Sequence, residues 1–210
     1  MSLEDKVLQV LNGPTVARIR FRFPITGGHI IITPQTFHRV ARAIRSGAVI
    51  VRRPTDLDPT AGAQYNDVAR TRQDGTGVRA NTLELNAVMG RFDEATIVHE
   101  SLHAAYDLQR TAGLDANSEE ASAITCTALC CRMTGLPLPR WTGSRIFANA
   151  ERVAQTLLSQ YQKGDRGIPT VGAAEWKTLR MGVLLEPAYF LKGPAGLFGT
   201  LASVQYTHDG

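Results

Sequence analysis

One predicted helix most constrains how this chain can fold. Residues 95–112 contain no Pro or Gly, and Val98 and Leu102 lie one turn apart within them. That spacing places apolar side chains on one face of a helix. Asp93 precedes the stretch as a predicted N-cap, and Gly113 follows as a predicted stop. The sequence therefore predicts a helix with one side packed against a core.

The same helix carries the sequence His99-Glu100-Ser101-Leu102-His103. Because residues four apart lie one above the other on a helix, His99 and His103 can direct two imidazoles at one metal ion. Glu100 lies beside them, where its carboxylate can take a proton from water on that ion. The alternative is a buried helix whose histidines are satisfied by hydrogen bonds. The H-E-x-x-H pattern favours metal and indicates a zinc hydrolase.

A catalytic zinc site needs a third protein ligand. Glu119 and Glu120 lie at the start of the next predicted helix, residues 118–133. A short connection that folds this helix back on the first would bring both carboxylates near the histidines. A structural alternative is a capping box, in which Asn117 is the N-cap and Glu120 pairs with it three positions later.

Two supporting roles have candidates. Asp107 follows His103 by one turn and can accept its second ring proton; alternatively, it is a solvated residue paired with Arg110. Hydrolysis also needs a donor that stabilises the oxyanion. The candidates for this donor are Tyr106, Tyr161, Tyr189, Tyr206 and His208.

The H-E-x-x-H segment together with Glu120-Ala121-Ser122 resembles the metal helix and the following helix of the gluzincin group of zincin metallopeptidases. The resemblance is closest to small bacterial HExxH proteins, including those similar to phage-repressor-cleaving regulators, and it covers about residues 83–129. It implies a zinc-dependent hydrolase of peptide bonds whose third metal ligand is a glutamate. Glu120 is preferred to Glu119 because Ala121, Ile124 and Ala128 then form a packed stripe beside it.

The chain also departs from neighbouring patterns. Thermolysin-like proteins carry an acid four residues after the ligand glutamate, whereas Ala123 and Ile124 occupy the corresponding positions here. Metzincins require Gly and His after the second histidine, and Tyr106 and Gln109 stand there instead. The metzincin branch is therefore set aside.

The expected function is that of a zinc metallopeptidase with Glu100 as general base and a protein or peptide as substrate. It would act as an intracellular regulator, or as a toxin or effector protease delivered to another cell. One alternative is an inactive zincin-fold binding module. Another is a basic nucleic-acid-binding protein with a structural metal.

Composition limits these choices. The net charge is +4, and many arginines lie in the N-terminal half, but no aromatic residues are interleaved with them, so a solvated basic face is favoured over a nucleic-acid surface. Cys126, Cys130 and Cys131 lie within one predicted helix and are interpreted as core residues rather than metal ligands. No membrane span or secretory signal is recognisable, which predicts a cytoplasmic location or export without a cleaved signal.

The expected fold class is α+β and zincin-like, with a small mixed sheet packed on the HExxH helix and a mainly helical C-terminal half. We expect a single domain over residues 1–210, sheet-rich in 1–92 and helical in 93–210. Strand 78–85 is expected at a sheet edge, with Glu84 facing outward, where an extended peptide could add. Residues 53–77 are expected to form a long loop. The other predicted strands are 16–22, 29–33 and 48–51. The other predicted helices are a short opening one through Val7 and Leu11, then 34–46, 144–162 and 173–183.

Overall fold

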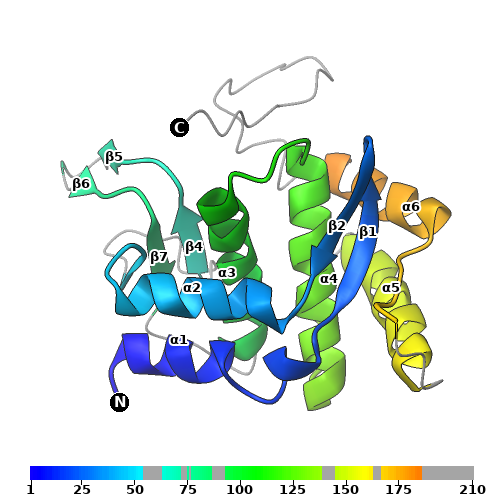
Figure 1. The fold of residues 1–210 in the computed structure, drawn as a ribbon, viewed down its shortest axis with the longest axis horizontal. Helices are drawn as coiled ribbons and strands as arrows, with labels where there is room; N and C mark the ends of the chain where they lie inside the picture. Colours follow the sequence, from blue (N-terminus) through cyan, green and yellow to red (C-terminus); the bar gives the residue numbers. More distant parts are fainter. Residues whose placement is uncertain are drawn as a thin grey trace. The chain divides into compact units, whose positions relative to one another are not determined.

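The computed structural model describes residues 1–53, 63–71, 75, 77–86, 93–138, 145–162 and 167–185. The chain is a mixed α+β protein (Figure 1). It divides into two compact units. The first unit contains Met1–Ile19 and Thr33–Arg110, and the second contains Arg20–Ile32 and the chain from Thr111. The single domain over residues 1–210 remains a prediction.

Where the structure describes it, the first unit combines three α-helices with short strands. Its helical elements are α1 (Leu3–Leu11), the 3-10 turn η1 (Val16–Arg18), α2 (Pro34–Arg45) and α3 (Asp93–Gln109). Its strands are β3 (Ile50–Arg52), β4 (Ala63–Asn66), β5 (Arg70–Thr71), β6 (Gly77–Val78) and β7 (Thr82–Leu85). The helix predicted from Pro34 is confirmed, and its predicted inner face of Phe37, Val40, Ala41 and Ile44 is buried.

The three-stranded sheet of this unit has the order β3-β7-β4. β7 pairs with β3 in parallel and with β4 in antiparallel orientation, so the edge position predicted for strand 78–85 is wrong. Two strands, β6 and β7, replace that single strand. The long loop predicted over residues 53–77 is also wrong in part, because it contains β4 and β5.

Glu84 on β7 does not face solvent as predicted; it is fully buried. Its carboxylate accepts a hydrogen bond from Arg52 Nε on β3 at 2.8 Å and another from Asn66 Nδ2 on β4 at 3.2 Å. A buried carboxylate is tolerated only when it is paired and hydrogen-bonded. These partners come from the strands on both sides of β7. Glu84, whose polarity had favoured an edge position in the sequence, therefore links the three strands.

In its described residues, the second unit contains a hairpin and three helices. The hairpin strands are β1 (Phe21–Ile25) and β2 (Gly28–Ile32), and the helices are α4 (Ala116–Thr134), α5 (Ile146–Gln162) and α6 (Ala173–Leu184). The three helices agree with the predicted ranges to within a few residues. The strand predicted over 16–22 begins later, at Phe21, because residues 16–18 form η1.

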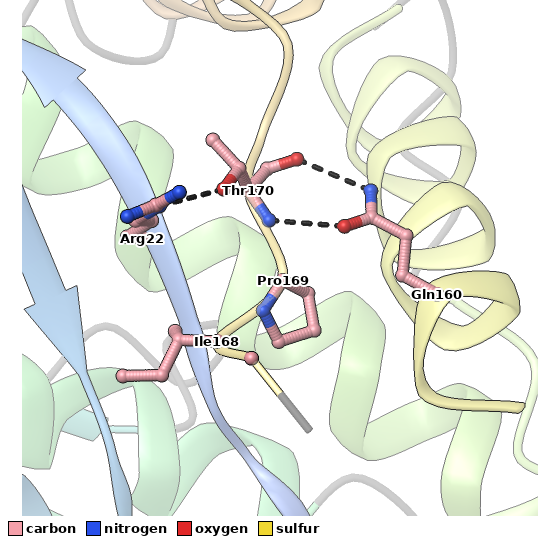
Figure 2. A pocket seen from close by; sticks show the side chains of 6 residues that line it. Arg22, Gln160, Ile168, Pro169 and Thr170 are labelled. Atoms are coloured by element: carbon pink, nitrogen blue, oxygen red, sulfur yellow. Dashed lines mark hydrogen bonds between the residues drawn. The ribbon is translucent and has the colours of Figure 1, made fainter. Parts of the chain in front are cut away.

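A segment near residue 170 extends the hairpin on its β1 side. Arg22 N–H donates to the Pro169 carbonyl at 2.8 Å, and Val171 N–H donates to the Arg22 carbonyl at 2.9 Å. Figure 2 shows how the Gln160 amide holds Thr170, accepting from its N–H at 3.1 Å and donating to its carbonyl at 3.2 Å. The small pocket there contains none of the predicted site residues.

The cysteines of α4 are core residues, as predicted. Cys126, Cys130 and Cys131 are all buried and free. Burial raises the pKa of the Cys126 thiol well above its usual value and that of Cys131 to about 11. Both groups therefore stay protonated near neutral pH, unlike metal-bound thiolates.

Among the described residues, no helix has the length and apolarity needed to cross a bilayer.

The N-terminus of α4 is capped by Asp115 rather than by Asn117. The Asp115 carboxylate accepts from Ser118 N–H at 3.0 Å and from the Ser118 hydroxyl at 2.8 Å, and it pairs with Arg180 of α6 at 2.9 Å. Asn117 and Glu120 therefore do not form a capping box, since the N3 position of this helix is Ser118.

This cap predicts a pH-dependent contribution to stability. Burial acts to raise the pKa of Asp115, but the Ser118 hydrogen bonds and the Arg180 charge outweigh it and leave the pKa below its usual value. The stabilisation is then present above about pH 4, the unfolded pKa, and is lost as the pH falls through the folded value. Asp115→Ala should lower the free energy of unfolding by about 1 kcal/mol at pH 6 and by less at pH 2.5, measured by urea unfolding.

Asp115→Asn is the matched control, because an Asn side chain still caps the helix but carries no charge. It should lose less stability than the Ala variant at pH 6. A loss in Asp115→Ala that is equal at both pH values would contradict an ionised cap.

Candidate metal centre

The two histidines of the HExxH segment lie one turn apart on α3. The His99 and His103 rings have centroids 5.1 Å apart, and both residues are half-buried. The predicted packed side of the helix is confirmed, since Val98, Leu102 and Ala105 are fully buried. The imidazoles thus lie on a helix that packing holds in place, and they remain partly accessible.

The ends of α3 differ slightly from the prediction. The helix begins at Asp93, whose side chain lies outside the described residues, so the predicted N-cap role is untested. It ends at Gln109, three residues before the predicted end. Arg110 follows in a left-handed conformation with φ +46, and its N–H donates to the Asp107 carbonyl at 2.9 Å. Gly113 is also left-handed, but it lies beyond the helix.

Glu100 is held by the main chain of strand β4. Its Oε2 accepts a hydrogen bond from the Tyr65 N–H at 2.8 Å, and the residue is half-buried. No described residue hydrogen-bonds to the second oxygen, Oε1. One carboxylate oxygen is therefore fixed by the protein, and the other remains available to a water molecule.

Tyr65 also contacts α3 through its side chain. Its hydroxyl lies 2.8 Å from Asp107 Oδ2 and 2.9 Å from Asn81 Oδ1. The role of Asp107 as the partner of His103 remains a prediction. Sequence reasoning missed Tyr65 because β4 has only four residues, too few for a clear alternation between apolar and polar positions.

The candidate third ligands, Glu119 and Glu120, are both half-buried residues near the start of α4. The stripe predicted beside Glu120 is confirmed, since Ala121, Ile124 and Ala128 are buried. Among the described residues, His99, His103 and Glu120 form a group of possible metal ligands whose ligand atoms lie within 4.8 Å of one another. Glu119 does not belong to this group.

The structure describes two of the five candidate oxyanion donors, Tyr106 and Tyr161. Tyr161 uses its hydroxyl on the main chain of Arg20, accepting from its N–H at 3.1 Å and donating to its carbonyl. Tyr106 is buried, with an exposed fraction of 2%. Tyr189, Tyr206 and His208 lie outside the described residues. The described part of the chain therefore assigns this role to none of them.

Comparison of the chain with known protein families, with curated proteins and with solved structures gives no match. The likeness to gluzincins therefore rests on the residues of the two helices alone.

Ser101, inside the HExxH segment, provides a test of how α3 is packed. Its hydroxyl is fully buried and has no hydrogen-bond partner in the described structure. Because an unsatisfied buried hydroxyl costs free energy, Ser101→Ala should leave the free energy of unfolding unchanged or raise it by up to about 1 kcal/mol. Urea unfolding measures this difference.

The matched control is Ser122→Ala on α4. Ser122 is equally buried, but its hydroxyl donates to the Glu119 carbonyl at 2.7 Å. Losing that bond should destabilise the protein by about 1 kcal/mol. An equal loss in both variants would mean that Ser101 has a partner in solution.

Proposed function

We propose that this chain is a zincin-like, zinc-dependent metallopeptidase in which His99, His103 and Glu120 hold the metal ion and Glu100 is the general base. The observation that carries the proposal is the grouping of these three ligand atoms within 4.8 Å, with Glu100 adjacent to one ligand on α3. Two imidazole nitrogens and one carboxylate oxygen form a donor set typical of catalytic zinc.

The donor set defines what the metal would supply. Three protein ligands leave the fourth position of a tetrahedral ion for water, and a bound zinc ion lowers the pKa of that water toward about 7 and polarises a carbonyl. The partial exposure of all three ligand residues supports access for solvent and substrate. The three buried cysteines offer no competing thiolate site.

Glu100 has the arrangement that a general base requires. The Tyr65 N–H fixes Oε2 at 2.8 Å, which restricts the rotation of a side chain with three rotatable bonds. Oε1 can then accept a proton from the attacking water and pass it to the leaving amine. An inactive binding module would have no need for this carboxylate, which disfavours that alternative.

Strand β4 offers a place for an extended peptide substrate. In the described part of the chain, β7 is the only strand paired with β4. The Tyr65 N–H points away from β7 and toward Glu100, so the outer edge of β4 lies beside the general base. Because the Tyr65 N–H is bound to Glu100, a peptide added as a strand would use the remaining outward main-chain groups of this edge. β4 thus takes the role that the sequence suggested for residues 78–85.

Metal content tests the ligand set. The purified wild-type chain should contain one zinc ion, measured by plasma mass spectrometry, and His103→Ala and Glu120→Gln should each lose it after dialysis. Glu119→Gln is the matched control and should keep the ion, because Glu119 lies outside the ligand group. Zinc that is lost from Glu119→Gln but kept by Glu120→Gln would reverse the assignment of the third ligand.

Activity tests the base. Glu100→Gln should keep zinc, since Glu100 is not a ligand, and should lower the rate of peptide hydrolysis at least about 100-fold. A peptide library read by mass spectrometry measures this loss and identifies the bonds cleaved. Full hydrolysis by the Gln variant would show that Glu100 is not the base.

A further inference from the structure

We propose that Tyr65 is a positioning residue that holds two acidic groups of α3, Glu100 and Asp107, from strand β4. The inference rests on the proposed function, because the positioned group is the proposed general base. It concerns a residue outside the HExxH segment and outside the ligand set.

The geometry on α3 supports this role. Glu100 and Asp107 are two helical turns apart, about 10.5 Å along the axis, and therefore share one face. The Tyr65 main chain binds the first at 2.8 Å, and its hydroxyl binds the second at 2.8 Å. His103 stands between them in the helix, three residues after Glu100 and four before Asp107. A single residue thus restrains both ends of the segment that carries a proposed metal ligand.

Tyr65 is itself held from both faces of the sheet. Successive side chains of a strand point to opposite faces. On the face opposite to Tyr65, Asn66 donates to Glu84 at 3.2 Å and to the Thr82 carbonyl at 3.3 Å. On its own face, the Tyr65 hydroxyl also meets Asn81, which adopts a left-handed conformation with φ +55 just before β7. The phenol donates its single proton to one of the two acceptors, Asp107 or Asn81, and the Asn66 bonds hold the strand.

Positioning of this kind affects turnover more than binding. A general base must lie within hydrogen-bond reach of the proton that it removes, and a displacement of about 1 Å can cost up to 100-fold in rate. Tyr65→Phe keeps the N–H that binds Glu100 but removes the bond to Asp107. We expect kcat to fall about tenfold, with KM and the zinc dissociation constant changed less than threefold.

A double-mutant cycle tests the link between Tyr65 and Asp107. Asp107→Ala should lower kcat to a similar degree, and the Tyr65→Phe/Asp107→Ala double variant should be no worse than either single variant, because each change removes the same hydrogen bond. The stability control is Ile44→Val, a change in the buried face of α2 that should cost about 1 kcal/mol without changing kcat.

A second pair of variants tests the main-chain hydrogen bond from Tyr65 to Glu100. The Tyr65 N–H points away from β7, so proline at this position removes the donor to Glu100 without removing a ladder bond. Tyr65→Ala loses only the phenol, whereas Tyr65→Pro loses both the phenol and the N–H that binds Glu100. The Pro variant should therefore have a kcat about tenfold below that of the Ala variant, at similar zinc content.

The outcomes separate this inference from the proposed function. A wild-type chain that neither binds zinc nor cleaves peptides overturns both. An active wild-type chain whose Tyr65→Phe kcat stays within twofold overturns the role of Tyr65 alone. A kcat loss that also appears in Ile44→Val, in proportion to the loss of thermal stability, overturns it as well. A loss confined to Tyr65 and Asp107, with KM and zinc affinity retained, supports it.

Discussion

The buried carboxylate of Glu84 is the interaction on which the geometry of the first unit depends. It lies on the central strand β7 and has no solvent exposure, and Arg52 on β3 and Asn66 on β4 both hydrogen-bond to it and so help to compensate its buried charge. An uncompensated buried charge would cost several kcal/mol. The strand order β3-β7-β4 places one partner of Glu84 on each side of β7.

The position of β4 in turn determines the surroundings of the proposed base. The residue after Tyr65 is tied to Glu84, and Tyr65 itself binds Glu100 and Asp107. Hydrogen bonds of the adjacent residues Asn66 and Tyr65 thus connect a buried ion pair to the face of α3 that carries Glu100 and Asp107. In the second unit, the Asp115 cap and its pair with Arg180 fix the start of α4, the helix that carries Glu120. Within each unit, one acidic residue with specific partners holds a strand or a helix in place.

Much of the helical structure could be predicted from sequence. α2, α4, α5 and α6 begin and end within a few residues of the predicted ranges, and the buried faces of α2 and α3 are those that the periodicity indicated. These features depend on contacts within one or two helical turns, so the local sequence predicts them. Short strands are stabilised by pairing with residues distant in sequence, so the local sequence does not predict them. The sequence does not predict β4, and it predicts an edge position for β7 because Glu84 between Leu83 and Leu85 has the alternation of a half-exposed strand.

The sequence by itself determined that His99, Glu100 and His103 share one helix and that the two imidazoles lie one turn apart, because helical geometry fixes these relations within five residues. It also determined that the three cysteines belong to a buried helix. Only the tertiary structure decided that Tyr65 binds Glu100, that Glu84 is buried at the centre of a sheet, and that Asp115 rather than Asn117 caps α4. The first two depend on pairing between strands distant in sequence, and the third depends on backbone conformation and on Arg180, which local residue preferences do not specify.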